Sequence, residues 1–234
     1  MPFYYYYDWT YILIVIGMLL SLAASAKVRS TYARYSAVRS ISGMTGEEAA
    51  RRILSFAGIY DVRIEHVAGN LTDHYDPRSK VLRLSDNVFG STSVAAIGVA
   101  AHECGHAIQH DRSYAPLKFR SLLAPVASFG ANISWPLILI GLLIGGTGIL
   151  VEIGILMFSL AVLFQLITLP VEWNASKRAL GVLSDTGILY SEEVPKARKV
   201  LGAAALTYVA AAATSILQLL RLLLLFGGRK NDRR

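Results

Sequence analysis

Ser93-Val-Ala-Ala-Ile-Gly-Val-Ala-Ala-His-Glu-Cys-Gly-His-Ala-Ile108 is the stretch of sequence that decides the fold. Hydroxyl residues from Ser91 to Ser93 can cap a helix here, and the helix should run from Val94 through at least Ile108. Outside its polar motif the helix consists mostly of alanine, valine and isoleucine, so we expect it to be largely buried. The polar residues on this buried helix are therefore the candidates for the chemistry of the chain.

The segment His102-Glu-Cys-Gly-His106 has the H-E-x-x-H pattern of a metal site. Helical residues four positions apart point within about 40° of each other, so both imidazoles can reach one ion. Zinc suits two neutral imidazoles and a carboxylate, and we therefore predict one Zn²⁺ ion held by His102 and His106. The alternative is a pair of core histidines satisfied by hydrogen bonds alone, which the spacing with Glu103 disfavours.

Glu103 is predicted to be the catalytic residue, acting as a general base. It lies about 100° round the helix from His102, beside the ion and not necessarily on it. There it can take a proton from a water molecule, which zinc acidifies toward a pKa of about 7, and pass it to a leaving amine. Its neighbour Cys104 points nearly away from the ion and is expected to be a small buried residue. The motif thus indicates a zinc peptidase.

A third protein ligand is needed, and Glu172 is the best candidate. It lies just after Pro170, at the end of a long apolar run. The chain would leave the membrane at this point, so Glu172 would lie at the face of the polar domain that is next to the membrane. A third histidine ligand six residues beyond His106 is excluded, because that position holds Arg112. His110 is four residues beyond His106, but three helical histidines spaced four residues apart turn progressively away from a single ion. Glu152 is expected at the outer rim of the membrane. The alternative for Glu172 is that it is a solvated glutamate at the membrane interface and binds no metal.

Length and composition limit the class of protein. The chain has 234 residues, enough for one catalytic domain and a few membrane spans. Apolar residues make up 54% of it, so part of the surface should face lipid. The net charge is +7, but the basic residues flank apolar segments, so we expect no nucleic-acid partner. The single cysteine excludes an intramolecular disulfide and a cysteine zinc ribbon.

Residues 1–26 are predicted to form an N-terminal transmembrane anchor. Trp9 to Ala26 is an uncharged apolar run, and Tyr4 to Tyr7 suit an interfacial aromatic belt. Basic residues follow the run from Lys27 onward, which places the amino terminus outside. A cleavable signal peptide is the alternative, but the positive segment that precedes the apolar run of such a peptide is missing.

Residues 27–120 are predicted to form a cytoplasmic catalytic region that contains the H-E-x-x-H helix. Thr45 to Glu48 can form a capping box at the start of a helix of about three turns. Val62 to Val67 alternates apolar and polar residues, and a turn at Asp76 to Lys80 precedes a second run, Val81 to Leu84. These segments predict a small antiparallel sheet.

Residues 121–169 are predicted to form a transmembrane hairpin, because Leu122 to Ile144 and Ile149 to Leu169 are long apolar runs joined by a glycine-rich tip, Gly145 to Gly148. Basic residues flank the hairpin on both sides, whereas its tip carries none. The catalytic region should therefore face the cytoplasm. Residues 170–200 are then expected to form a helical region that supplies the third ligand.

The fourth apolar segment, residues 201–226, leaves two alternatives open. Basic residues precede it and a basic tail, residues 227–234, follows it, so both ends favour the inside of the cell. The segment could cross fully, or its second half, with Arg221 among leucines, could lie in the interface. The sequence therefore predicts an α+β fold, mainly α, with three to four transmembrane helices in a bacterial cytoplasmic membrane.

Four segments carry a family resemblance: Leu84–Phe89, Ala101–Gln109, Leu169–Arg178 and Ala203–Ala210. Through them the chain resembles the YugP-type bacterial membrane zinc metallopeptidases, which are similar to the gluzincin proteases of the HtpX and CAAX prenyl protease kind. The resemblance implies an integral membrane gluzincin-like fold in which His102, His106 and Glu172 bind zinc and Glu103 is catalytic. It also implies that the strand near Val81 to Ser85 is the sheet edge that pairs with an extended substrate.

One position departs from the gluzincin pattern. Related gluzincins have an aspartate four residues after the ligand glutamate, whereas this chain has Ser176 there, with Asn174 nearby. The group that orients the histidines is therefore left unassigned. Tyr208 and His74 are candidates for stabilising an oxyanion, without support from their spacing.

Three functions remain to be compared. The first is a membrane-bound zinc-dependent endopeptidase that cleaves unfolded or membrane-associated polypeptides with zinc-activated water and a glutamate base. The second is a non-catalytic membrane scaffold or adaptor with a structural zinc site, in which all four coordination positions would be filled by protein ligands. A transporter or channel has support only from the number of apolar segments. Expected partners are a polypeptide substrate, the lipid bilayer, and either further copies of the chain or other membrane proteases.

Overall fold

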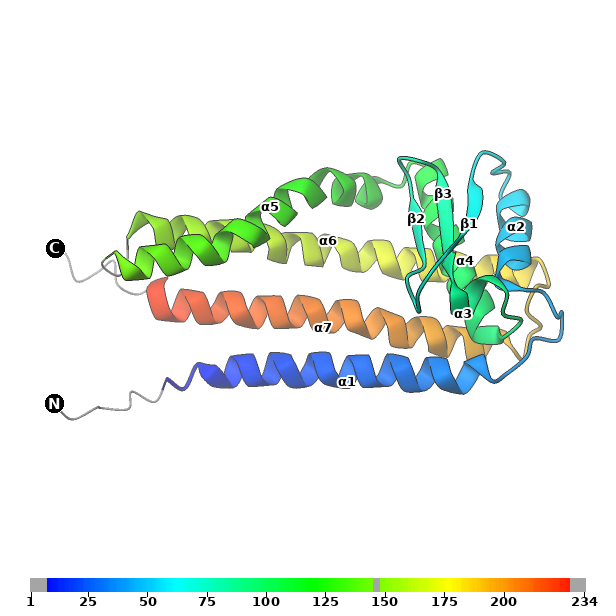
Figure 1. Cartoon of the computed structure of the whole chain (residues 1–234), viewed down its shortest axis with the longest axis horizontal. Helices are drawn as coiled ribbons and strands as arrows, with labels where there is room; N and C mark the ends of the chain where they lie inside the picture. Colours follow the sequence, from blue (N-terminus) through cyan, green and yellow to red (C-terminus); the bar gives the residue numbers. More distant parts are fainter. Residues whose placement is uncertain (1–7, 145–147, 228–234) are drawn as a thin grey trace. The chain divides into compact units, whose positions relative to one another are not determined.

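The computed structural model describes residues 8–144 and 148–227 (Figure 1). The described residues form seven helices and three strands, so the prediction of a mainly helical chain with a small sheet is confirmed. Three predicted features, the aromatic belt at Tyr4 to Tyr7, most of the hairpin tip and nearly all of the basic tail, lie outside the described residues. Contacts divide the chain into two compact units, which we call the apolar unit, residues 1–23, 120–167 and 208–234, and the site unit, residues 24–119 and 168–207.

Six elements belong wholly to the site unit: α2 (Gly46–Phe56), β1 (Arg63–Val67), β2 (His74–Asp76), β3 (Val81–Ser85), α3 (Asp86–Phe89) and α4 (Val94–Asp111). Four longer helices contribute residues to both units: α1 (Tyr11–Ser36), α5 (Ala115–Leu143), α6 (Ile149–Asp185) and α7 (Val194–Phe226). The long helices therefore supply the apolar unit, and their ends complete the site unit.

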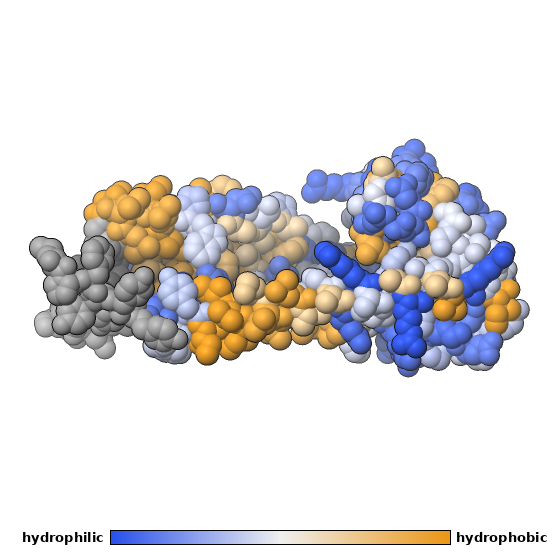
Figure 2. All heavy atoms as spheres, turned by 60° about the horizontal axis from the view of Figure 1, so that its bottom comes forward, coloured by the Kyte–Doolittle hydropathy of each residue, from blue (hydrophilic) through white to orange (hydrophobic). Residues whose placement is uncertain are grey.

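The apolar unit consists of helical segments that lie side by side (Figure 1). Helices α1, α5, α6 and α7 are each long and apolar enough to cross a membrane. Their outward-facing leucines are unusually open, with Leu19, Leu122 and Leu156 between 57% and 75% exposed. Figure 2 shows hydrophobic side chains over much of this surface. A surface of this kind is suited to lipid.

Helices α5 and α6 approach each other closely at glycines. A Cβ atom on Gly130 would lie 2.7 Å from the Met157 carbonyl oxygen, and one on Gly154 would lie 2.9 Å from the Ser134 carbonyl oxygen. Such distances leave no room for a side chain. Small residues at helix contacts are the usual means by which membrane helices bring their backbones together.

Helices α1 and α7 run antiparallel in the apolar unit. Arg221 near the end of α7 pairs with Asp8 just before α1 at 3.1 Å and stacks over the Tyr11 ring at 4.5 Å. Further along, the hydroxyl groups of Ser21 and Thr214 are 3.1 Å apart. The second half of α7 therefore follows α1 to its start instead of turning away at Arg221.

Two predicted helix starts in the site unit are confirmed. The Thr45 side chain accepts a hydrogen bond from the Glu48 backbone N–H at 3.2 Å, and the Glu48 carboxylate accepts one from the Thr45 backbone N–H at 2.8 Å. This reciprocal pair begins α2. The Ser93 hydroxyl accepts a bond from the Ala96 N–H at 3.1 Å and so caps α4, the helix of the H-E-x-x-H motif.

The prediction of an antiparallel sheet is wrong for the two strands that the sequence indicated, because β1 and β3 are parallel, and β2 was not among the predicted strands. The strand order is β1-β3-β2, with β2 antiparallel to β3 and β1 parallel to it. The turn at residues 76–80 fixes only the β2–β3 hairpin. Because β1 pairs with the other edge of β3, its direction depends on a longer connection that the alternating pattern of the strands does not encode.

Strand β3 is the central strand, so the expectation that it forms the substrate-binding edge is also wrong. It pairs with β1 over its whole length and with β2 from Val81 to Arg83. Val81, Leu82 and Leu84 are fully buried. A strand with apolar residues on both faces is typical of the middle of a sheet, and this feature of the sequence already favoured the central place.

Helix α4 lies at the centre of the site unit, as its composition predicted. It packs against α2 and the sheet. Ile97 of α4 belongs to one buried cluster with Ile53 of α2, Leu82 of β3 and Leu183 of α6. Because this core surrounds the helix, the positions of its polar residues are fixed by packing.

Candidate metal centre

The structure brings together the three side chains predicted to bind metal. His102 and His106 lie on one face of α4, with ring centroids 4.8 Å apart. Glu172 comes from α6, three residues past the apolar run, and its Oε2 lies 3.2 Å from His102 Nε2 and 3.5 Å from His106 Nε2. All three side chains are largely buried. They form a group whose potential ligand atoms lie within 4.8 Å of one another.

The spacing and chemistry of this group fit a zinc ion. Two ligand atoms held about 2.1 Å from a tetrahedral ion are roughly 3.4 Å apart, close to the separations between Glu172 and the two histidines. Two imidazole nitrogens and a carboxylate oxygen are a ligand set that zinc accepts. Among the described residues the group offers three protein ligands, the number that a catalytic zinc site uses when it keeps its fourth position open.

Gly105 lets α4 and α6 come close enough to place Glu172 beside the two histidines. A Cβ atom at this position would lie 2.5 Å from the Ala175 carbonyl oxygen, which belongs to the helix backbone and cannot rotate away. The Gly105 position lies between the two histidines in sequence, and Ala175 lies one turn after Glu172. The absence of a side chain at Gly105 therefore sets the distance between the two histidines on α4 and Glu172 on α6.

Replacing Gly105 with alanine is expected to lower the free energy of unfolding of the site unit by about 1–3 kcal/mol and to weaken metal binding, because α6 must move away. Gly98 on the same helix is a matched control. A Cβ atom there would meet Ala197 Cβ at an ordinary 3.5 Å, so Gly98→Ala should be neutral or stabilising. Thermal unfolding and metal titration of both variants test the difference, and equal effects would contradict it.

Gln109 fixes the orientation of the His106 ring. Its Oε1 lies 3.1 Å from His106 Nδ1, and its Nε2 donates hydrogen bonds to the Val171 carbonyl oxygen at 2.8 Å and to Asn174 Oδ1 at 3.0 Å. Because both amide hydrogens are used, the amide oxygen faces the ring. Nδ1 then carries the proton, and the lone pair of Nε2 is left on the side of Glu172.

Ser176 has the corresponding place beside the other histidine. Its hydroxyl oxygen lies 3.1 Å from His102 Nδ1. These orienting groups could not be assigned from the sequence, because related gluzincins have a carboxylate where this chain has Ser176. The spacing of both residues in the sequence indicates a contact with the site. Ser176 follows Glu172 by one helical turn, and Gln109 follows His106 by three residues on α4.

Replacing Gln109 with leucine is expected to weaken zinc binding by about 10- to 100-fold, because the His106 ring loses the acceptor that fixes its tautomer. Leucine is apolar and similar in size, so the buried volume changes little. Ile108→Leu, one residue earlier on α4, is the control for repacking alone. Titration with a competing chelator measures both affinities, and an unchanged affinity in the first variant would remove the positioning role.

The charges around His106 favour a cation at this place. Burial opposes the charged form of the ring, but the hydrogen bond to Glu172 and the charges of Glu103 and Glu172 outweigh it and raise the pKa of His106. The same negative charges would attract a divalent ion. Burial raises the pKa of the Cys104 thiol well above its usual value, and its sulfur lies 3.7 Å from the Ala50 carbonyl oxygen. This residue packs in the core, as predicted.

Glu103 is 9% exposed and follows His102 on the same buried helix. Within the part of the chain that the structure describes, no hydrogen bond from another residue occupies its carboxylate. It is therefore available to a water molecule or a substrate proton. Its role as the general base stays a prediction.

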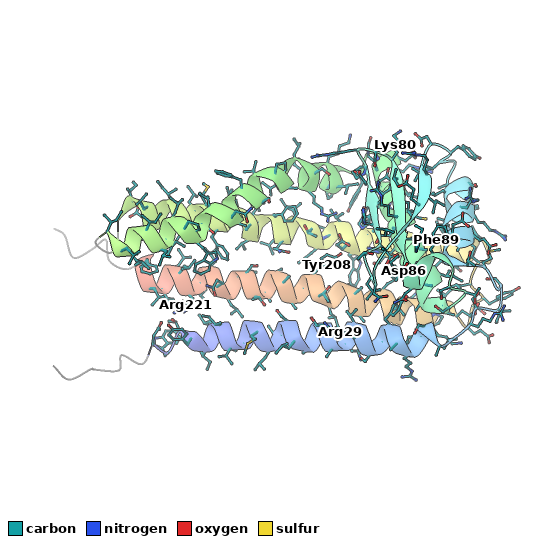
Figure 3. All side chains as sticks on the ribbon, viewed as in Figure 1. Arg29, Lys80, Asp86, Phe89, Tyr208 and Arg221 are labelled. Atoms are coloured by element: carbon teal, nitrogen blue, oxygen red, sulfur yellow. The ribbon has the colours of Figure 1, made fainter. Side chains whose placement is uncertain are left out.

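The other candidate residues are placed elsewhere. His110 Nδ1 lies 2.9 Å from the Tyr75 hydroxyl oxygen, so it connects α4 to β2. Glu152 is in the first turn of α6 and is not in the metal-binding group found among the described residues. His74 is exposed on β2, with Nδ1 2.8 Å from the Thr72 carbonyl oxygen. Tyr208 lies on α7 (Figure 3), and both oxyanion assignments stay predictions.

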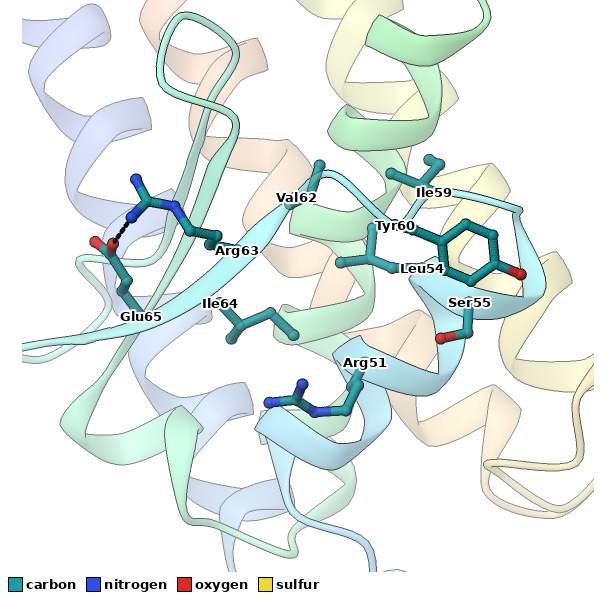
Figure 4. A pocket seen from close by; sticks show the side chains of 9 residues that line it. All are labelled: Arg51, Leu54, Ser55, Ile59, Tyr60, Val62, Arg63, Ile64 and Glu65. Carbon is teal, nitrogen blue, oxygen red and sulfur yellow. Dashed lines mark ion pairs between the residues drawn. The ribbon is translucent and has the colours of Figure 1, made fainter.

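A separate pocket of about 460 Å³ lies between α2 and β1 (Figure 4). Leu54, Ile59 and Ile64 form its apolar wall, and Arg63 at its rim pairs with Glu65 at 3.8 Å. None of the three predicted ligands lines it. The metal group is thus formed by the contact of α4 with α6 and is independent of this pocket.

Comparison with known proteins agrees with the resemblance drawn from the motifs. The chain is 49% identical over 214 residues to "Putative membrane protease YugP" of Bacillus subtilis (strain 168), covering 92% of this chain and 95% of that protein. No solved structure matches the chain. A family match extends over residues 10–227, which includes His102, Glu103, His106 and Glu172. The chain therefore belongs to the family described as "Putative neutral zinc metallopeptidase".

Proposed function

We propose that this protein is a membrane-bound, gluzincin-like zinc endopeptidase that hydrolyses peptide bonds with Glu103 as the general base. One observation carries the proposal. Two histidine nitrogens of α4 lie 3.2 and 3.5 Å from the same oxygen of Glu172, a residue 70 positions away from His102 in the sequence. Membership of a zinc metallopeptidase family supports it further.

Each residue of the group has a defined part in the proposed reaction. Zinc, when bound by His102, His106 and Glu172, supplies a Lewis acid that acidifies water and polarises a carbonyl group. Glu103 accepts the proton of the attacking water and delivers it to the nitrogen of the leaving amine. Ser176 and Gln109 hold the two rings with Nε2 free to coordinate. The buried surroundings strengthen these electrostatic interactions.

The substrate in this proposal is an unfolded or membrane-associated polypeptide bound in an extended form. Since β3 is central, only β1 and β2 have an outer edge that could pair with such a chain. Of the two, β2 is connected to the active helix through Tyr75 and His110. We therefore assign the substrate to the outer edge of β2. Association with further copies or with other membrane proteases stays a proposal.

The site is proposed to face the cytoplasm. Lys27 and Arg29 follow the apolar run of α1, and Lys177 and Arg178 follow that of α6, so basic residues gather where the long helices enter the site unit. Positive charge of this kind is concentrated on the cytoplasmic side of membrane proteins. With four crossings, the start of α1 and the end of α7 would both lie outside.

Metal analysis combined with a cleavage assay tests the proposal. Purified protein should contain one zinc ion per chain, with three protein ligands by X-ray absorption spectroscopy, and should cleave casein. A chelator should abolish cleavage and added zinc should restore it. A zinc ion with four protein ligands in a protein that cleaves nothing would instead favour a scaffold or adaptor.

A further inference from the structure

A groove of about 560 Å³ lies between α1 and α7 within the site unit. On α1 its lining includes Lys27, Thr31 and Arg34, which follow one another at helical spacings of four and three residues. On α7 it includes Lys199 and Gly202, again three residues apart. Each helix thus presents one continuous stripe of side chains to the groove.

Three cations line this groove without a carboxylate beside them. Among the described residues, no acidic side chain pairs with Lys27, Arg34 or Lys199. Elsewhere in the same unit the basic side chains of Lys80 and Arg83 do have acidic partners. The guanidinium carbon of Arg34 lies 5.6 Å from the centroid of the neighbouring Tyr35 ring, which carries no negative charge. The groove therefore has an excess of positive charge and open N–H donors.

The groove lies where both helices change from apolar to polar. Lys27 directly follows the apolar run that ends at Ala26, and Lys199 is the last charged residue before the apolar run of α7. Ala203 and Leu206, which complete the lining, belong to the first turns of that run. Because the two helices run antiparallel and Tyr35 packs with Val200, Arg34 and Lys199 lie at the polar end of the groove, whereas Lys27 lies toward its apolar end with Leu206.

The walls of the groove are fixed by packing. Tyr35 of α1 is 7% exposed and Val200 of α7 is 5% exposed, and both belong to one buried cluster with Ala95 of α4. Gly202 faces open space, because a Cβ atom at this position would meet no atom of another element within 4 Å. The groove is therefore an open one with room above Gly202.

We propose that this groove binds the headgroup of an anionic phospholipid. The phosphodiester would accept hydrogen bonds from Lys27, Arg34 and Lys199, and an acyl chain would lie along Ala203 and Leu206. Charge complementarity with three unpaired cations selects an anion, and the adjoining apolar surface selects a lipid over a small soluble phosphate. The site is independent of the peptidase proposal, because none of its residues belongs to the metal group.

Native mass spectrometry of the full chain, released from detergent with added phosphatidylglycerol or phosphatidylcholine, tests the proposal. We expect one retained phosphatidylglycerol per chain and much less phosphatidylcholine. Lys27→Gln with Lys199→Gln should weaken retention about 25-fold, at about fivefold per cation near a membrane surface. The matched control, Arg29→Gln with Arg198→Gln, removes two charges from the same helices outside the groove and should retain the lipid.

A second pair of variants leaves every charge in place. Gly202→Leu fills the groove and should also reduce retention, whereas Gly181→Leu, at another open helical glycine in the same unit, should not. Thermal unfolding shows that each variant is folded.

Equal loss in both charge variants, equal retention of the two lipids, or full retention by Gly202→Leu would each overturn the proposal. Competition with inorganic phosphate or glycerol phosphate distinguishes a lipid headgroup from a soluble phosphate as the ligand of the groove. Displacement of the lipid by either one at low millimolar concentration would show a site for a soluble phosphate instead.

Discussion

Glu103→Gln is expected to abolish peptide hydrolysis while the protein keeps its zinc. Glutamine has nearly the same shape as glutamate but cannot accept a proton at neutral pH. Loss of a general base typically lowers the rate by about 10²- to 10⁴-fold. The zinc content should stay at that of the wild type, because Glu103 is outside the group of three ligands. Steady-state cleavage of casein and metal analysis on the same preparation measure both effects.

Glu65→Gln is a suitable control for that experiment. Glu65 is a surface carboxylate of β1 whose partners are Arg63 and Arg83, and it is far from the metal ligands in sequence. Its loss should leave the cleavage rate nearly unchanged. Wild-type activity in Glu103→Gln, on any substrate that the wild type cleaves, would exclude the proposed mechanism. Loss of zinc in that variant would mean that Glu103 is a ligand or supports one.

Glu172→Ala is expected to release the zinc. The variant leaves two imidazoles of α4 as the remaining ligands and removes the carboxylate that both rings contact. Substitution of a residue that merely orients a ligand costs about 10- to 100-fold in affinity, so loss of a direct ligand should cost more than about 100-fold. Titration against a chromophoric chelator gives the two dissociation constants, and cleavage should disappear at zinc concentrations that saturate the wild type.

Glu152→Ala provides the comparison on the same helix. It removes a carboxylate from the first turn of α6, and its zinc affinity should equal that of the wild type. His106→Ala should behave like Glu172→Ala. Retention of zinc in Glu172→Ala but not in His106→Ala would require another third ligand, and a low affinity in Glu152→Ala would identify it.

Features of the fold that depend on local sequence were predictable. The capping box at Thr45 and the Ser93 cap of α4 were confirmed because a cap is decided by residues three positions apart. The apolar runs predicted long helices, since length and composition alone define a candidate span. The positions of His102 and His106 on one face of α4 followed from helical periodicity.

Features that depend on contacts between distant segments were harder to predict. The direction of β1 relative to β3 is set by a long connection, and the alternation of its residues is the same for either direction. Gln109 orients His106 only because α6 supplies Val171 and Asn174 as acceptors for its amide hydrogens. The sequence shows that a glutamine is present, but the partners that make it specific are more than sixty residues away.

Helix α6 is continuous from Ile149 to Asp185, so one helix contains both the lipid-suited run and Glu172. A helix rises about 1.5 Å per residue, and Glu172 follows Leu169 by three residues, so its backbone lies roughly 5 Å further along the helix axis than the end of that run. In the proposed membrane peptidase, this short spacing would set the depth of the reaction relative to the bilayer. A polypeptide would then have to approach the membrane surface before it could be cleaved.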